Sequence, residues 1–310
     1  MSEHTPPRFP WRGYWSPRHW PTWLGIGLLW LMARPPYPWA LALGRGLGRL
    51  SYWLAGRRRR IAQANIRLCF PQLSPEEQER LVRQTMASSG MAVVEAILAW
   101  SASKRRLRPL LHIEGMEHLE RAREAGRGAI LIGGHFAPML IAGRLLAMEL
   151  DFNILVKKIR NPLLEAVIRW HRERDYAGII DAMDLRAMVR HLKRGEVCWY
   201  APDQDLGASR SVFAAFMGVP TATLTTTARL ARLSGAPLVP IDYERLPDAK
   251  GYLLRIHPAL ENYPSGDDVA DARRVNEFIE EQVRRVPAEY VWVHRRFKTR
   301  PPGEPAVYDG

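Results

Sequence analysis

A histidine at the end of an apolar run is the first candidate for chemistry in this sequence. The run Ala129–Ile132 is followed by Gly133, Gly134 and then His135. A strand that ends in two glycines would expose the imidazole at a sheet edge, because glycine lets backbone or substrate approach closely. An imidazole with a pKa of about 6.5 suits a general base that acts on a hydroxyl at neutral pH. A lone histidine is also common as a structural residue, so the spacing alone leaves both interpretations open.

Two carboxylates follow a second apolar run. Asp203 and Asp205 come after Val197–Ala201, and Arg210 follows in the same loop. Strand-end loops that hold charged groups often carry function, although such residues also solvate loops and cap helices. We predict that Asp203 or Asp205 orients a catalytic group or binds substrate. Paired carboxylates can also indicate a metal, but no histidine lies within a few residues to complete a site, so we predict none.

Arginines supply a third group of candidates. Arg174 and Arg210 could bind phosphate, since guanidinium groups match phosphate oxygens. Arg229 and Arg232 could do so for the same reason. As single positions they are equally well explained as ordinary surface arginines.

The elements that must position these residues follow from the pattern after Leu111. Short apolar runs alternate there with amphipathic stretches, which predicts an α/β fold with its chemistry in strand-end loops. The predicted strands are Ala129 to Ile132, Ile154 to Lys157, Gly178 to Ile180, Val197 to Ala201, Pro237 to Ile241 and Tyr252 to Ile256. The predicted helices include Asn161 to Arg174, Met183 to Lys193 with Gly195 as its cap, and a helix capped by Ser74 that runs from about Pro75 to the Trp100 region.

Composition narrows the class of protein. The chain of 310 residues is 47% hydrophobic and 25% charged, as expected for a folded globular protein. Its net charge of +13 would attract nucleic acid, anionic lipid or acidic protein. The two cysteines, Cys69 and Cys198, are too few for a disulfide framework, so we expect reduced, structural thiols.

The first part of the chain is rich in tryptophan, which concentrates at membrane interfaces. Its uncharged runs, Trp20–Ala33 and Pro35–Gly44, are borderline for a span of about 20 residues. The polar, Pro-rich start Met1–Pro17 fits a cleaved signal peptide poorly. We therefore predict that residues 1–56 form a retained membrane-anchoring segment, either a span or an interfacial Pro-broken hairpin, before an α/β domain at 57–310. The basic block Arg57–Arg60 would face anionic lipid or form a solvated helix face.

Several longer strings carry a family resemblance. They include Trp23-Leu-Gly-Ile-Gly, Trp199-Tyr-Ala-Pro-Asp-Gln-Asp and Trp292-Val-His-Arg-Arg-Phe-Lys-Thr-Arg-Pro. In type and order they resemble the lauroyl and myristoyl acyltransferases of lipid A biosynthesis, within the wider glycerolipid acyltransferase group, over about Pro17 to Pro301. The resemblance implies a mixed sheet flanked by helices at the cytoplasmic face of the bacterial inner membrane. It also implies fatty acyl transfer from acyl carrier protein to a hydroxyl of a lipid A precursor, with membrane lipid as a partner and no cofactor.

The same resemblance assigns His135 as the general base and exposes two departures. The group's motif places Asp or Glu five positions after the histidine, where this chain has Leu140, and Ala182 stands where the family often has arginine. Leucine cannot accept a hydrogen bond from the imidazole or stabilise its charge. Three interpretations remain: Asp203 or Asp205 orients His135, the enzyme is slow or has changed its acceptor, or catalysis has been lost.

Three hypotheses about function follow. The first is an acyltransferase of lipid A biosynthesis. The second is a catalytically impaired or repurposed membrane-bound homologue that acts on another lipid or binds lipid without catalysis, which Leu140 and Ala182 favour. The third is nucleic-acid binding, suggested by the net charge and by the basic, aromatic segment His294–Arg300. The Trp-rich start and the family-like strings argue against it, so we expect no nucleic acid partner.

Overall fold

The protein is built around one mixed β-sheet of seven strands, seen in a computed structural model that describes residues 9–308. The first eight residues of the predicted anchoring segment and the last two of the chain lie outside the described residues. The strand order is β1-β9-β8-β2-β5-β3-β4. The five strands from β8 to β4 are parallel, β9 runs antiparallel to β8, and β1 is parallel to β9. The predicted fold class, a mixed sheet flanked by helices, is therefore confirmed.

The strand bounds agree well with the apolar runs. The strands of the sheet are β1 (Leu111–Glu114), β2 (Ala129–Ile132), β3 (Phe152–Val156), β4 (Gly178–Asp181), β5 (Val197–Tyr200), β8 (Leu238–Arg245) and β9 (Tyr252–Ile256). A separate antiparallel hairpin, β6 (Ser211–Phe216) and β7 (Val219–Leu224), was not predicted. It turns at Met217 and Gly218, which both have positive φ. The sequence pattern also missed β1, whose alternating half-buried and exposed residues give no apolar run.

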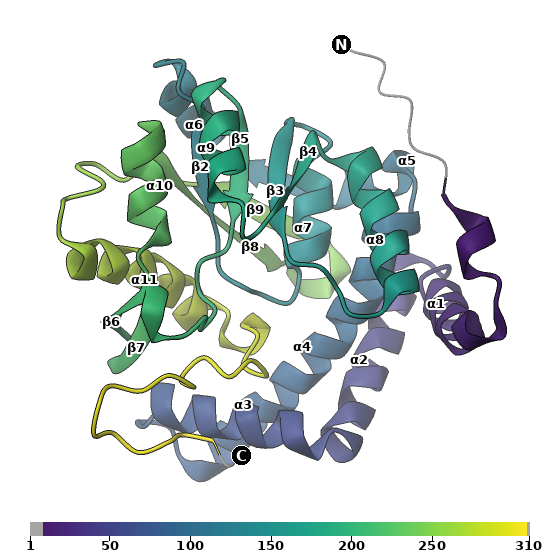
Figure 1. Cartoon of the computed structure of the whole chain (residues 1–310). Helices are drawn as coiled ribbons and strands as arrows, with labels where there is room; N and C mark the ends of the chain where they lie inside the picture. Colours follow the sequence, from purple (N-terminus) through teal and green to yellow (C-terminus); the bar gives the residue numbers. More distant parts are fainter. Residues whose placement is uncertain (1–8, 309–310) are drawn as a thin grey trace.

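Helices surround the sheet (Figure 1). They are α1 (Trp20–Met32), α2 (Tyr37–Leu54), α3 (Gly56–Cys69), α4 (Pro75–Ser101), α5 (Lys104–Leu107), α6 (Met116–Arg123), α7 (Met139–Leu146), α8 (Pro162–Asp175), α9 (Leu185–Lys193), α10 (Thr226–Ser234) and α11 (Asp268–Arg285). The predicted start of α4 is confirmed, because Ser74 and Glu77 form a reciprocal capping box. The predicted α8 and α9 are also present, capped by Asn161 and Asp184.

The helices α2 and α4 pack together through glycine. A Cβ on Gly90 would lie 2.3 Å from the carbonyl oxygen of Gly44, and one on Gly48 would lie 2.3 Å from that of Met86. These distances are too short for any side chain, so the two backbones can approach this closely only because glycine occupies the contact. The buried side chains of α2 join the same hydrophobic core as those of the sheet, including Tyr37 and Leu41.

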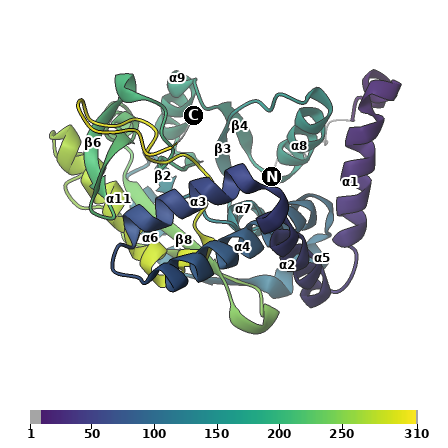
Figure 2. The same ribbon diagram turned by 90° about the horizontal axis from the view of Figure 1, so that it is seen from below.

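The first helix has a different environment. None of the 13 residues of α1 is buried, and Trp20, Leu24, Leu28 and Leu31 are strongly exposed along it. In Figure 2, α1 lies at one edge of the molecule. The uncharged runs form α1 and the start of α2, and within residues 9–308 no helix combines the length and apolar character needed to cross a membrane. Membrane anchoring by residues 1–56, and a domain boundary there, stay predictions.

Both cysteines are buried and unpaired, as expected for structural thiols. Burial raises the pKa of Cys198 to about 12, and burial likewise raises the pKa of Cys69 far above its usual value. Neither thiol is therefore a nucleophile at neutral pH.

Candidate active site

The sheet topology brings His135 and Asp203 together. Strands β2 and β5 are parallel neighbours, with Ile132 opposite Tyr200, so their carboxyl ends meet at one edge. His135 follows β2 by three residues, and Asp203 follows β5 by three residues. The Nδ1 atom of His135 lies 2.5 Å from Oδ1 of Asp203, and the backbone N–H of His135 donates to Oδ2 at 2.9 Å. Both carboxylate oxygens therefore hold the same histidine.

The charge of Asp203 is stabilised by its surroundings. Its side chain is 1% exposed, whereas that of His135 is 22% exposed. Burial alone would raise the pKa of Asp203, but the charge and hydrogen bonds of His135, together with the charge of Arg296, outweigh it and hold the pKa well below the usual range. An ionised carboxylate can only accept hydrogen bonds, so Nδ1 carries the proton. Nε2 is then the basic nitrogen on the partly exposed side chain.

A C-terminal segment fixes the loop that carries His135. The backbone N–H of Ala137 donates to the carbonyl oxygen of Glu289 at 2.7 Å, and that of Val291 donates to His135 at 3.0 Å. Between them, Phe136 and Tyr290 form an isolated antiparallel bridge. The loop after β2 is therefore held on one side by β5 and on the other by residues 289–291.

The two glycines before His135 serve the protein's own packing. A Cβ on Gly134 would lie 2.7 Å from the ring of Phe136 and 3.0 Å from Ile279. The carbonyl oxygen of Gly134 also accepts a hydrogen bond from the hydroxyl of Tyr243. A Cβ on Gly133 would lie 3.0 Å from the carbonyl oxygen of Ile241, so the predicted close approach of backbone occurs at Gly133, whereas Gly134 is crowded by core side chains.

Three residues near Asp203 were not predicted as part of the site. Burial, followed by the charge of Asp203, raises the pKa of Tyr290 well above its usual value, and a hydrogen bond between the two side chains adds to this. Burial lowers the pKa of His294 to about 4, against opposing effects that include the charge of Asp203. Arg296 is 1% exposed and donates to the carbonyl oxygen of Ala222. The signal available in the sequence was the basic and aromatic character of His294–Arg300, which by itself suggested nucleic-acid binding and not a catalytic site.

Asp205 has a different role from Asp203. Its carboxylate accepts hydrogen bonds from the backbone N–H of Gly207 at 2.9 Å and from the backbone and hydroxyl of Thr299 at 2.6 and 2.8 Å. It is 4% exposed and is not bonded to His135. The structure thus brings one of the two predicted carboxylates to the histidine and uses the other to fasten the strand-end loop to the C-terminal segment.

The predicted phosphate-binding arginines are dispersed. Arg174 ends α8 in an ion pair with Asp175 at 3.0 Å and donates to the carbonyl oxygen of Trp100. Arg210 precedes β6, with its guanidinium 3.6 Å from the sulfur of Met183. Arg229 and Arg232 are exposed on α10. The structure shows no contact between any of them and His135 or Asp203.

Comparison with known proteins shows the family of the whole chain. The model of the bacterial lipid A biosynthesis acyltransferase family matches residues 11–299. The chain belongs to this family.

Two relatives of this chain, both lipid A acyltransferases from Escherichia coli K12, match it over nearly its full length. The lipid A biosynthesis lauroyltransferase is 40% identical over 94% of this chain and 96% of its own length. The lipid A biosynthesis palmitoleoyltransferase is 40% identical over 96% of this chain and 97% of its own length. Among solved structures, a 1-acyl-sn-glycerophosphate acyltransferase from Thermotoga maritima matches 81% of this chain and 99% of its own, with 16% identity and a TM-score of 0.35.

The two departures from the expected acyltransferase pattern lie in different places. Leu140 is half-buried in the first turn of α7, directly after the His135 loop. Ala182 follows β4 at the edge of the sheet, and β5 and β3 separate this strand from β2. With neighbouring strands about 4.8 Å apart, position 182 is remote from the histidine, whereas position 140 follows it in the same loop and helix.

Proposed function

We propose that this member of the lipid A acyltransferase family transfers a fatty acyl chain from acyl carrier protein to a hydroxyl of a lipid A precursor, with His135 as general base. The observation that carries the proposal is the pair His135–Asp203, held by two hydrogen bonds at 2.5 and 2.9 Å between adjacent strand ends. Asp203 would take the orienting role that the expected acid at position 140 cannot, because leucine has no acceptor.

The reaction would use the two nitrogens of His135 in different ways. Nδ1–H stays bonded to Asp203, while Nε2 removes the proton from the acceptor hydroxyl. The hydroxyl oxygen attacks the thioester carbonyl carbon, the carbon–sulfur bond breaks, and the departing thiolate takes the proton from the imidazolium. The low pKa of Asp203 supports this scheme, since a buried negative charge beside Nδ1 stabilises the imidazolium as it forms.

The surface of the molecule fits partners of this class. A net charge of +13 would steer encounter with an acidic carrier protein and favour an anionic membrane surface. The exposed tryptophans and leucines of α1 and α2 suit a membrane interface, so we place the protein at the cytoplasmic face of the bacterial inner membrane. Membrane lipid is then a further partner.

The test is acyl transfer by the purified, detergent-solubilised chain. Lauroyl and palmitoleoyl thioesters of acyl carrier protein would serve as donors and a tetra-acylated lipid A precursor as acceptor, with mass-spectrometric detection of product. We expect transfer by the natural chain, loss in His135→Ala, and retention in His112→Ala, since His112 is exposed on the edge strand β1. Transfer that survives in His135→Ala would show that the base is wrongly assigned.

The second candidate is a catalytically impaired or repurposed homologue that acts on another lipid or binds lipid without catalysis. Leu140 favours it, because the acid expected five positions after the histidine is missing. Absence of transfer by the natural chain across the donor panel, with the protein folded, would favour this candidate over the first.

A further inference from the structure

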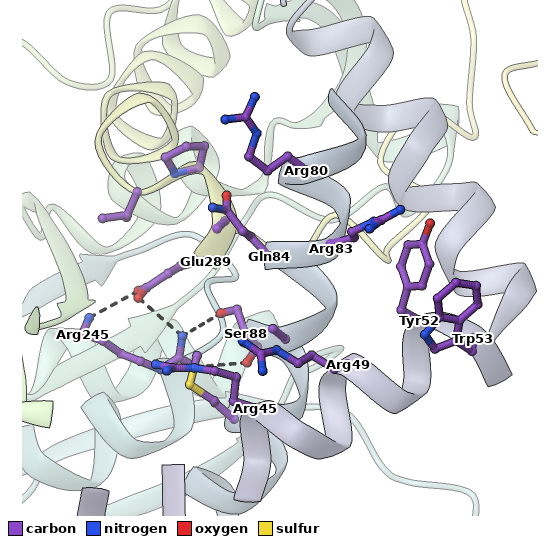
Figure 3. A pocket seen from close by; sticks show the side chains of 15 residues that line it. Arg45, Arg49, Tyr52, Trp53, Arg80, Arg83, Gln84, Ser88, Arg245 and Glu289 are labelled. Atoms are coloured by element: carbon purple, nitrogen blue, oxygen red, sulfur yellow. Dashed lines mark hydrogen bonds and ion pairs between the residues drawn. The ribbon is translucent and has the colours of Figure 1, made fainter. Parts of the chain in front are cut away.

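A second site is formed by a cavity of about 780 Å³ that neither His135 nor Asp203 lines. Its walls come from α2, α4, the end of β8 and the segment 286–289. This volume lies within the range of about 300–1,000 Å³ found for small-molecule sites. Five arginines line the cavity, namely Arg45, Arg49, Arg80, Arg83 and Arg245 (Figure 3).

Two of the five arginines are neutralised within the protein. Arg245, at the buried floor, is bonded to Glu95 through Nε at 2.5 Å and Nη2 at 2.7 Å, and forms an ion pair with Glu289 at 3.4 Å. Arg83 pairs with Glu79 at 3.4 Å. Glu95 and Glu79 therefore balance Arg245 and Arg83.

Of the other three arginines, Arg80 interacts electrostatically with Glu77, whose pKa its charge helps to lower. Within residues 9–308, no ion pair joins Arg45, Arg49 or Arg80 to a carboxylate, and in Figure 3 the side chains of Arg45 and Arg49 extend toward Arg245. The lining carboxylate, Glu289, loses much of its charge near neutrality because burial raises its pKa to about 7. Arg80 extends away from Arg45 and Arg49 in Figure 3, so Arg45 and Arg49 are the two cations that line the cavity without a counter-charge of their own. A phosphate group with several oxygens is the partner that guanidinium groups match best.

The faces of α2 indicate where such a phosphate would come from. Its buried face packs on α4, and an exposed apolar stripe formed by Trp39, Leu43, Leu50, Trp53 and Leu54 lies on its far side. At 100° per residue, Arg45 and Arg49 share the strip between these two faces. A helix with tryptophan and leucine on one strip and arginine beside them has the pattern of a helix at the headgroup level of a membrane.

We propose that this arginine cavity binds a phosphate monoester carried by a membrane lipid, whose acyl chains lie along the apolar stripe of α2. The inference does not require the proposed acyl transfer, because binding is a property of α2 and α4. The cavity is nevertheless joined to the catalytic loop, since Glu289 in its wall accepts the backbone hydrogen bond of Ala137.

Titration calorimetry on the detergent-solubilised full chain tests the proposal. The ligands are short-chain phosphatidic acid, phosphatidylcholine with the same chains, and inorganic phosphate. The cavity variant is Arg45→Gln/Arg49→Gln, and its matched control is Arg186→Gln/Arg190→Gln, which removes the same charge from exposed positions of α9 that do not line the cavity. His135→Ala serves as a third protein.

We expect saturable binding of one phosphatidic acid per chain, at least tenfold tighter than binding of phosphatidylcholine or inorganic phosphate. The cavity variant should raise the Kd at least tenfold and the control less than twofold, while His135→Ala binds as the natural chain does. Equal weakening in both double variants would show a diffuse surface effect and overturn the site. Equal affinity for inorganic phosphate and phosphatidic acid would overturn the lipid as its source, and loss of acyl transfer alone would leave the proposal untouched.

Discussion

Replacement of Asp203 by asparagine is the sharpest test of the candidate site. The change keeps the size of the side chain and an oxygen that can accept from the backbone N–H of His135, but it removes the negative charge beside Nδ1. The amide can also donate to Nδ1, which would place the proton on Nε2, the nitrogen that must act as base. We therefore expect a correctly placed histidine in the wrong tautomer.

The expected loss is large. A hydrogen bond to a buried charged group contributes about 1.5–3 kcal/mol, and the loss of imidazolium stabilisation adds to it. In serine proteases the equivalent neutralisation lowers the rate by about 10⁴-fold. For Asp203→Asn we expect kcat to fall by about 10³- to 10⁴-fold, or about 4–5 kcal/mol in activation free energy, at about 1.4 kcal/mol per tenfold.

The assay is kcat for acyl transfer at saturating donor, with thermal unfolding to confirm that each variant is folded. Asp205→Asn is the matched control, because Asp205 lies two residues away, is equally buried, and bonds Gly207 and Thr299 instead of the histidine. It should lower the melting temperature and change kcat by less than about tenfold. A folded Asp203→Asn variant with kcat within tenfold of the natural chain would refute the orienting role.

Four further outcomes are expected. Gly90→Ala should destabilise the protein by about 2 kcal/mol in urea unfolding, because its Cβ would meet the backbone of α2, while Gly46→Ala, whose Cβ meets nothing within 4 Å, should not. Between about pH 6.5 and 4, buried His294 and His171, each with a pKa lowered to about 4, make stability fall as pH drops, because the unfolded chain binds the protons first, while Glu289, with its pKa raised to about 7, opposes them. His294→Gln should therefore reduce the fall by up to about 1.4 kcal/mol per pH unit relative to the natural chain in pH-dependent unfolding, and an unchanged slope would contradict the burial of neutral His294. Leu140→Glu should change kcat by less than about tenfold, since Nδ1 of the histidine is already bonded; a larger gain would mean that the existing acid orients it poorly. Added salt should raise the apparent KM for the carrier-protein donor, and an unchanged KM would count against electrostatic steering.

Much of the architecture could be predicted because its elements have local signals. The buried strands β2 and β5 are continuous apolar runs, and the start of α4 is marked by the sequence Ser74-Pro-Glu-Glu, which forms a capping box. The strand β1 and the β6–β7 hairpin were missed because their residues alternate between buried and exposed or turn at a non-glycine residue with positive φ. The local sequence pattern predicts strands least well where a strand forms because of its packing against neighbouring strands.

Part of the site could also be predicted, because some of its residues follow strands that the sequence marks locally. His135 and Asp203 could be proposed because each follows an apolar strand, but the choice between Asp203 and Asp205 depends on where the chain turns after β5. Tyr290 and His294 could not be placed, because they reach the site through a segment whose position depends on the antiparallel bridge with Phe136. Contacts between residues so far apart in sequence carry no local periodicity.

The pairing of β2 with β5 offers a replacement for the acid that the motif expects at position 140. An acid five positions after the histidine would lie in α7, whereas Asp203 comes from a neighbouring parallel strand 68 residues away. The strand-end acid bonds both the ring and the backbone of His135, so it fixes the loop as well as the tautomer. The departure from the expected motif is therefore compatible with an active enzyme in which Asp203 orients His135, and the Asp203→Asn variant tests that role.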